Sequence, residues 1–152
     1  MARNGLVRNY MSDKCFFDSN ILVYMQDVEE PQKQQISRSL FFECVADNSA
    51  FISTQCLQEF YNVVAKKKKL EAKSAKQTIH ELSKSLPVIQ ITPVMIENAI
   101  DISVETQFSF WDSLILSAAK SADCNILYSE DLNDGQIIRG VTIKNPFAKV
   151  NS

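Results

Sequence analysis

The chain has 152 residues, of which 45% are hydrophobic and 22% are charged, and its formal net charge is −2 at pH 7. These values are typical of one globular domain with its own core, and they exclude an overall positive charge that would attract nucleic acid. Only three glycines are present and neither GxGxxG nor GxxxxGKS/T occurs, which argues against a dinucleotide-binding protein or a P-loop nucleoside triphosphatase.

The first part of the chain predicts one strand and one long helix. We expect residues 1–13 to form a flexible N-terminal extension and residues 14–18 to form a short apolar strand. Residues 21–25 fit either a helix or a continued strand, because periodicity does not distinguish the two over five residues. Residues 32–46 predict an amphipathic helix. Its apolar positions are Ile36, Leu40, Phe41 and Val45.

A second strand is predicted at residues 50–53, followed directly by a helix. The hydroxyls of Ser53 and Thr54 are suited to cap this helix, which ends in the run from Lys66 to Lys69. The spacing i, i+3, i+4 and i+7 marks its expected core face. That face comprises Leu57, Phe60, Tyr61 and Val64.

The remainder of the chain continues the alternation of helices and strands. Helices are predicted at residues 71–85, 94–106 and about 111–122, and strands at residues 87–91, 125–129 and 140–143. We expect one domain over residues 14–147 and a C-terminal tail over residues 148–152. The alternation predicts an α/β fold with a largely parallel sheet and helices on both faces.

The cysteines and the single histidine exclude several kinds of site. The four cysteines are far apart, each in an apolar segment, so we predict reduced and buried thiols. His80 is the only histidine, which excludes a multi-histidine zinc site and disfavours a Ser-His-Asp triad. No apolar run approaches the ~20 residues that cross a bilayer, and residues 1–10 lack the apolar segment of a signal peptide. We therefore expect a cytoplasmic protein without a membrane partner.

Several carboxylates lie where a parallel sheet binds its ligands, just beyond the carboxyl ends of the strands. Asp18 ends the first predicted strand, and Glu130 and Asp131 follow the strand at residues 125–129. Glu59 lies in the first turns of the helix after the second strand. Taken singly, each also fits an ordinary turn acid or a solvated helix acid.

Asp112 lies at the start of the helix predicted at about residues 111–122, and its i+3, i+4 and i+7 neighbours are apolar. The spacing Ser109-x-x-Asp112 also fits a capping box, and an acid in the first turn suits the helix dipole. A cap and a metal ligand are compatible roles. We keep both for this residue.

The candidate acids form a set of oxygen donors that includes no histidine or cysteine. Such carboxylates repel one another unless a cation joins them, and Mg²⁺ or Mn²⁺ is the cation that prefers oxygen ligands. A bound divalent ion can activate water for attack on a phosphodiester. It would also let a mildly acidic protein act on a polyanion.

Four segments, FFDSN, STQCLQEF, FWDSLILSAA and LYSEDLNDGQ, follow one another in an order that resembles the PIN domain. The chain is especially similar to the VapC-like ribonuclease toxins of toxin–antitoxin pairs. The resemblance covers residues 14–147 and implies a three-layer α/β/α fold with a mostly parallel sheet of about five strands. It further implies a Mg²⁺- or Mn²⁺-dependent endoribonuclease that forms a homodimer and is inhibited by a small antitoxin.

The resemblance also implies which residues form the site. The metal ligands and catalytic residues would be Asp18, Glu59, Asp112 and Asp131. The residues that support them would be Asn20, Ser129, Glu130 and Asp134. The assignment within SEDLND stays open, because Glu130 and Asp134 are alternatives to Asp131.

Contacts with RNA are predicted from basic and aromatic residues. The lysine run is either a solvated helix end that complements the helix dipole or part of a track for the RNA backbone. The residues of that track would be Lys66, Lys67, Lys68, Lys69 and Arg139, with Lys73 as a further candidate. We expect Trp111 to pack against the core, and stacking on a base is its alternative role.

Two other functions fit parts of the pattern. A haloacid-dehalogenase-like phosphatase also has an Asp after its first strand, but it needs a second acid two residues later, where this chain has Asn20. A PIN-like module that only binds RNA or protein would keep the fold without binding metal. The presence of all four acids disfavours that module. Within the PIN family, a housekeeping role in RNA processing is the alternative to a toxin.

Overall fold

The computed structural model describes residues 13–151, so nearly all of the predicted N-terminal extension lies outside the described residues. Its centre is a six-stranded sheet with the strand order β3-β2-β1-β4-β6-β5. The strands are β1 (Cys15–Phe17), β2 (Ala50–Ser53), β3 (Val88–Ile89), β4 (Ile126–Tyr128), β5 (Ile137–Ile138) and β6 (Val141–Lys144). All neighbouring pairs are parallel except β5 and β6.

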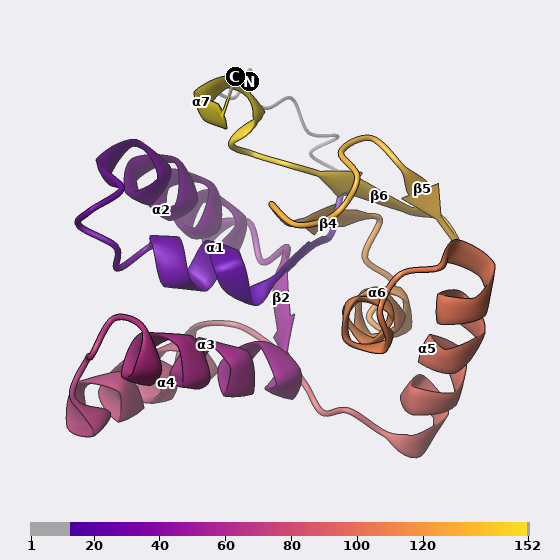
Figure 1. The fold of residues 1–152 in the computed structure, drawn as a ribbon, viewed down its shortest axis with the longest axis horizontal. Helices are drawn as coiled ribbons and strands as arrows, with labels where there is room; N and C mark the ends of the chain where they lie inside the picture. The colour runs from indigo at the N-terminus through magenta and orange to yellow at the C-terminus, as the bar shows by residue number, and fades with distance from the viewer. Residues whose placement is uncertain (1–12, 152) are drawn as a thin grey trace.

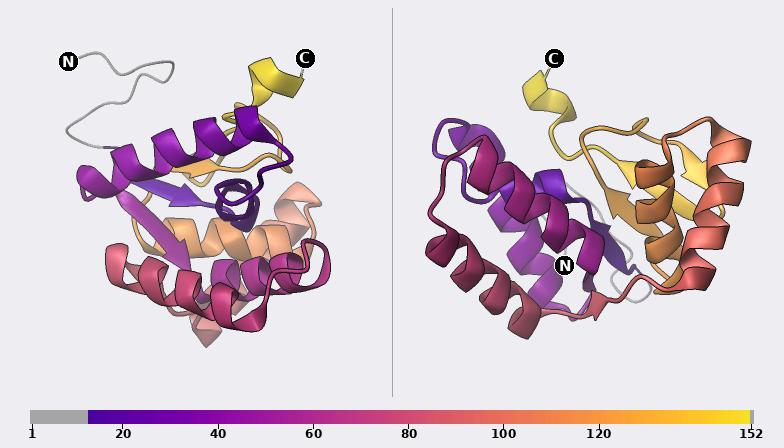
Figure 2. Two further views of the ribbon diagram at one scale, coloured as in Figure 1. Left: turned by 90° about the vertical axis from the view of Figure 1, so that its left-hand side faces the viewer. Right: turned by 60° about the horizontal axis from the view of Figure 1, so that its bottom comes forward.

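Helices cover both faces of this sheet. They are α1 (Ser19–Tyr24), α2 (Pro31–Ala46), α3 (Thr54–Lys66), α4 (Ala72–Ser85), α5 (Pro93–Thr106), α6 (Phe110–Ser121) and α7 (Ala148–Asn151). Helices α1 to α4 lie on one side and α5 with α6 on the other (Figure 1), and Figure 2 shows the same separation from two further directions. The predicted three-layer α/β/α architecture is confirmed, with one strand more than expected.

The central strands are apolar along their whole length because both of their faces are buried. All three residues of β1 and all three of β4 are buried. Phe17 stacks on Tyr128 of the neighbouring strand with ring centroids 5.3 Å apart, and it meets Phe41 of α2 edge-on at 5.4 Å. This aromatic contact between strands and helix layer fixes the carboxyl ends of β1 and β4 in the core.

The structure resolves the alternative that the sequence left open for residues 21–25: residues 21–24 belong to helix α1 and Met25 is its C-cap. The helix begins at Ser19 because Asp18 is its N-cap and accepts a hydrogen bond from the Ser19 amide at 2.7 Å. The predicted cap of α3 is also present, since the Ser53 hydroxyl accepts from the Cys56 amide at 3.4 Å.

Two predictions of burial are wrong. Tyr61 is 41% exposed, because the buried stripe of α3 follows Cys56, Phe60 and Val64 and leaves Tyr61 at its edge. Trp111 is 62% exposed. It lies in the first turn of α6, where the following apolar residues face the core and Trp111 does not.

The predictions for the thiols are confirmed, since all four cysteines are buried and none of them forms a disulfide among the described residues. His80 lies exposed on α4.

Residues 148–151, expected as part of a tail, form the short helix α7. None of the helices within residues 13–151 is both long enough and apolar enough to cross a membrane.

Candidate active site

The site lies where β1 and β4 run side by side in the middle of the sheet. From β1 the chain continues to β2 and β3 on one side, whereas β4 leads to β6 and β5 on the other. Ligands of open α/β sheets bind at such a switch point, beyond the carboxyl ends of the strands. The register pairs Phe17 with Tyr128, so Asp18 and Ser129 leave the sheet next to each other.

Asp18 is the most enclosed of the candidate acids, with 5% of its surface exposed. Its Oδ1 accepts from the Ser19 amide, and its Oδ2 accepts from the Ser129 hydroxyl at 2.8 Å. Burial raises the pKa of Asp18 from 3.8 to about 7, against the two hydrogen bonds that lower it. The charges of Glu59 and Asp131 raise this pKa further. A carboxylate in such surroundings needs a cation to stay ionised near neutral pH.

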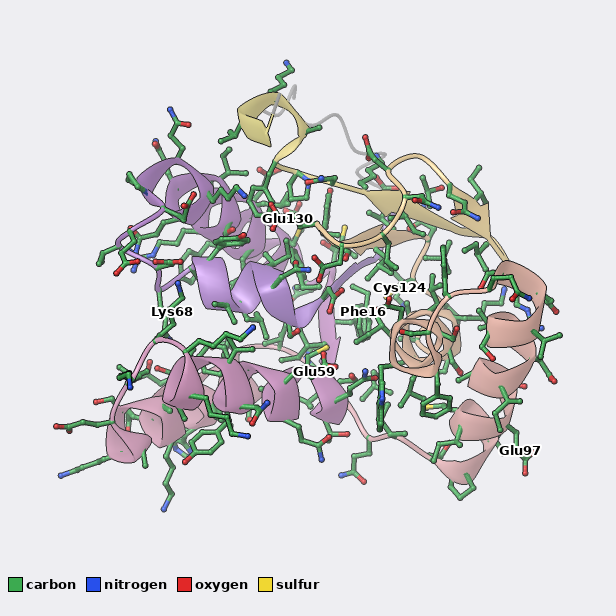
Figure 3. The ribbon with its side chains drawn as sticks, viewed as in Figure 1. Phe16, Glu59, Lys68, Glu97, Cys124 and Glu130 are labelled. Atoms are coloured by element: carbon green, nitrogen blue, oxygen red, sulfur yellow. The ribbon has the colours of Figure 1, made fainter. Side chains whose placement is uncertain are left out.

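Glu59 reaches the same place from α3, and Figure 3 shows it on the side of this helix that faces α1. The Ser19 hydroxyl donates to Glu59 Oε1 at 3.0 Å and lies 3.5 Å from Asp18 Oδ1, so one hydroxyl group spans the two carboxylates. Glu59 is half-buried. It is therefore directed into the site and is not an ordinary solvated acid of the helix surface.

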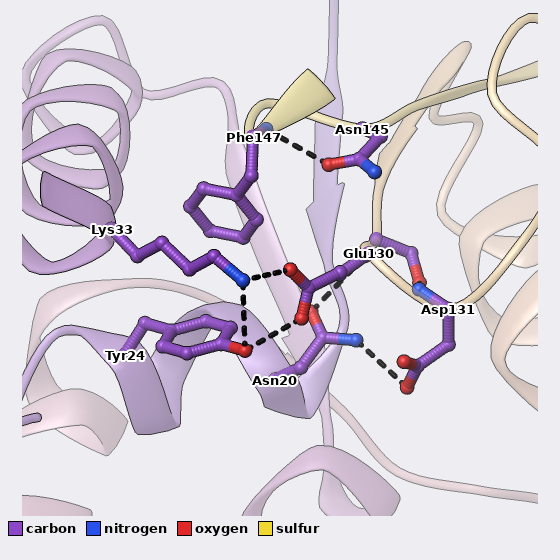
Figure 4. Close-up of polar contacts among 8 residues, drawn as sticks. Asn20, Tyr24, Lys33, Glu130, Asp131, Asn145 and Phe147 are labelled. Atoms are coloured by element: carbon purple, nitrogen blue, oxygen red, sulfur yellow. Dashed lines mark hydrogen bonds and ion pairs between the residues drawn. The ribbon is translucent and has the colours of Figure 1, made fainter. Parts of the chain in front are cut away.

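Asp131 is joined to the site by its own side chain and by its main chain. Its Oδ2 accepts from Asn20 Nδ2 at 3.0 Å, and its amide donates to the Ser129 hydroxyl oxygen at 3.2 Å. Asn20 also accepts from the Glu130 amide at 3.4 Å through its Oδ1 (Figure 4). The structure thus brings Asn20 and Ser129 together with the acids they were predicted to support.

Asp112 enters from α6, on the other side of the sheet from Glu59. Its amide donates to the Ser109 hydroxyl at 3.1 Å, so the predicted helix cap is present. Burial raises the pKa of the Asp112 carboxyl, a side-chain hydrogen bond with Ser109 lowers it, and the negative charge of Asp131 raises it further. Asp112 therefore combines a place in the helix cap with electrostatic contact to another candidate ligand.

The four acids converge without forming a closed ligand shell. Within residues 13–151, no three side chains among His, Cys, Asp and Glu meet at one point as a finished metal site requires. Hydroxyl and amide groups of Ser19, Asn20 and Ser129 connect Asp18, Glu59 and Asp131 instead, and Asp112 is linked to them through the charge of Asp131. The donor set is nonetheless suited to Mg²⁺ or Mn²⁺, because it consists of carboxylate oxygens around one buried carboxyl. Mutual repulsion keeps such groups apart until a cation neutralises them.

Glu130 does not belong to this acidic group in the structure. Its carboxylate binds Lys33 Nζ at 2.6 Å and accepts from the Tyr24 hydroxyl at 2.6 Å (Figure 4). Asp134 is also engaged elsewhere, since its Oδ1 accepts from the Asn145 amide at 2.8 Å. Of the three acids left open by the sequence, Asp131 is the one whose charge acts on the carboxyls of Asp18 and Asp112.

The basic residues predicted to contact RNA are not gathered in one track. Lys68 pairs with Asp27 at 2.9 Å, beside a cavity of about 400 Å³ that Lys67 and Lys69 also line. Arg139 lies between β5 and β6 and forms two hydrogen bonds with Glu105, of 2.6 and 3.3 Å. The labelled Lys68 and the β5–β6 end of the sheet lie on opposite sides of Figure 3. The lysine run therefore stands apart from Arg139.

Two polar residues of the site were missed in the sequence. Ser19 lies directly after Asp18, and Gln55 donates from its Nε2 to Glu59 Oε2 at 3.2 Å and to the Trp111 carbonyl at 3.0 Å. The signal for Gln55 was its i, i+4 spacing from Glu59, which places both side chains on one helix face. Ser19 had no signal beyond its position.

A family model for the PIN domain matches residues 15–134, so the chain belongs to the PIN domain family. No curated protein sequence matches it. Solved structures with the same fold include a toxin–antitoxin complex from Klebsiella pneumoniae, 18% identical with a TM-score of 0.65 over 88% of this chain and 98% of that chain. DNA-bound VapBC from Salmonella typhimurium is 17% identical with a TM-score of 0.66 and the same coverage.

A third similar structure is VapC20 of Mycobacterium tuberculosis, described as a toxin that cleaves the sarcin–ricin loop. It is 15% identical, with a TM-score of 0.56, and the match covers 75% of this chain and 87% of that chain. At these identities the likeness shows the fold alone.

Proposed function

We propose that the protein is a Mg²⁺- or Mn²⁺-dependent endoribonuclease. The observation that carries this proposal is Asp18, a buried carboxyl at the switch point of a PIN domain, with the charges of Glu59 and Asp131 beside it. Such a group is costly unless a cation meets it. A divalent ion held by carboxylates is the centre that hydrolysis of a phosphodiester requires.

Asp18, Asp112 and Asp131 would hold the ion, and Glu59 would either bind it or orient the attacking water. When bound, the ion would lower the pKa of a coordinated water and offset the charge of the scissile phosphate. Ser129 fixes one oxygen of Asp18, and Ser19 holds Glu59 next to it. These contacts hold the carboxylates of Asp18 and Glu59 next to each other, where they would orient a water for in-line attack on the phosphate. Cleavage of RNA that requires an added divalent ion is the test of this proposal.

The toxin of a toxin–antitoxin pair is the biological role we propose. The Klebsiella and Salmonella structures with the same fold are toxin–antitoxin assemblies, which supports a small antitoxin as partner of this chain. The family resemblance further supports a homodimer. We propose that the protein acts in the cytoplasm, where the proposed RNA substrate and antitoxin would both be found.

Trp111 is proposed to stack on an unpaired base next to the scissile phosphate. Its side chain is exposed although it directly precedes Asp112, and the Phe110 ring supports it edge-on with centroids 5.1 Å apart. Aromatic side chains that stack on bases favour single-stranded RNA. The lysine run would add backbone contacts that do not depend on sequence.

We expect single-stranded RNA to quench the fluorescence of Trp111, which is the only tryptophan of the chain. The Asp18→Asn protein would be titrated with a short RNA, because it should bind the RNA without cutting it. With a fluorescently labelled RNA as the readout, Trp111→Ala in the Asp18→Asn protein should bind about 10-fold more weakly, in line with the loss of one stacked base. Phe42→Ala is the control, since Phe42 is an exposed aromatic on α2. Unchanged emission in the presence of bound RNA would refute the stacking role.

A further inference from the structure

Gln55 is a buried residue of α3 whose side-chain amide connects two walls of the site. Its Nε2 donates to Glu59 Oε2 at 3.2 Å, one turn along the same helix. The same nitrogen donates to the main-chain carbonyl of Trp111 at 3.0 Å, in the first turn of α6 and next to Asp112. Within residues 13–151, this is the only hydrogen bond that joins α3 to α6.

The stability of the fold does not explain the side-chain amide of Gln55. Gln55 is 3% exposed, and its Oε1 has no hydrogen-bond partner among the described residues. A buried carbonyl oxygen without a partner destabilises the fold, and an apolar side chain of similar length would avoid that loss. The two bonds made by Nε2 therefore offer the better explanation of why an amide occupies this position.

We propose that Gln55 is a positioning residue that sets the separation between Glu59 and Asp112 and so prepares the metal site. The inference rests on the proposed function, because it concerns the same carboxylates. Glu59 approaches from α3 and Asp112 from α6, on opposite sides of the sheet. Four carboxylates that do not yet form a closed shell need such a tether, since their charges repel one another.

Trp111 gives this proposal a spectroscopic readout, because its carbonyl is one of the two acceptors of Gln55. A shift of Glu59 on binding Mg²⁺ would reach the first turn of α6 through the Gln55 amide. We therefore expect Mg²⁺ to change the emission of Trp111 in the wild-type protein. The change should be lost in Gln55→Met even at Mg²⁺ concentrations that saturate the variant.

The test compares Gln55→Met with Gln58→Met, because Gln58 is an exposed glutamine on the same helix. Calorimetric titration with Mg²⁺ should show about 10-fold weaker binding by Gln55→Met, the loss typical of residues that orient metal ligands. Gln58→Met should bind like the wild type. Both should melt within about 4 °C of the wild type in EDTA. Gln55→Asn, whose shorter amide cannot reach both acceptors, should weaken binding equally and serves if Gln55→Met does not fold.

The outcomes separate this inference from the proposed function. If Gln55→Met binds Mg²⁺ as tightly as the wild type, the positioning role is wrong and the proposed function stands. Weaker binding that accompanies a large loss of melting temperature in both Gln55 variants would also overturn it, since the fold would then account for the effect. If the wild type binds no Mg²⁺, the proposed metal site is wrong and the inference with it.

Discussion

Asp18→Asn should reduce RNA cleavage more than about 1,000-fold, well beyond the 10–100-fold cost of a residue that only orients metal ligands. The substitution removes the most enclosed carboxylate of the site while leaving a side chain that can still cap α1. Cleavage of a labelled RNA would be measured with both proteins at saturating Mn²⁺. Expression of the wild type should arrest growth, and Asp18→Asn should relieve the arrest if the protein is a toxin.

The same substitution should make the metal-free protein more stable. Burial and the neighbouring charges of Glu59 and Asp131 disfavour an ionised Asp18, as its pKa of about 7 indicates, and an amide carries no such penalty. We expect its free energy of unfolding to be about 2 kcal/mol larger than that of the wild type. This corresponds to a melting temperature about 6 °C higher in EDTA at pH 7.5. Cleavage by Asp18→Asn at the wild-type rate would mean that Asp18 does not serve the chemistry. A lower melting temperature of the variant would mean that the Asp18 carboxylate stabilises the fold.

Asp131→Asn should reduce cleavage more than about 100-fold, whereas Asp134→Asn should change it less than about 3-fold. Asp131 meets Asn20 and Ser129 and acts electrostatically on Asp18 and Asp112. Asp134 instead accepts from the Asn145 amide, a bond that an asparagine oxygen can keep. Both substitutions replace one carboxylate oxygen by an amide nitrogen, so each variant is the control for the other. Equal losses would contradict the assignment of Asp131 as the ligand in this segment.

The layer architecture was predictable because strands and helices alternate with clear spacing, and the rule for strand ends placed Asp18 and Asp131 correctly at the switch point. The contacts between these residues were not predictable. Ser129 and Asp18 are 111 positions apart, as are Asn20 and Asp131. Only the register of β1 against β4 brings such pairs together, and no local pattern carries that register.

The features that the sequence did not predict correctly have local physical causes. Strand β5 has two residues, one of them exposed, which is too short for a period-2 pattern. Trp111 lies in a first helical turn, where apolar character does not decide which side faces the core. Glu59 resembled a surface acid because its partner, the Ser19 hydroxyl, comes from another helix. The spacing of residues in the sequence predicts which side chains share one face of a helix. It does not predict which element packs against that face.

The central claim is that this PIN domain cuts RNA with the help of a divalent ion, and one measurement tests it most directly. The purified chain, free of any antitoxin, would be treated with EDTA and incubated with single-stranded RNA before and after excess Mn²⁺ is added. Our account predicts intact RNA in EDTA and cleavage once Mn²⁺ is present. Cleavage that continues in EDTA, or RNA that stays intact after Mn²⁺ is added, would contradict it.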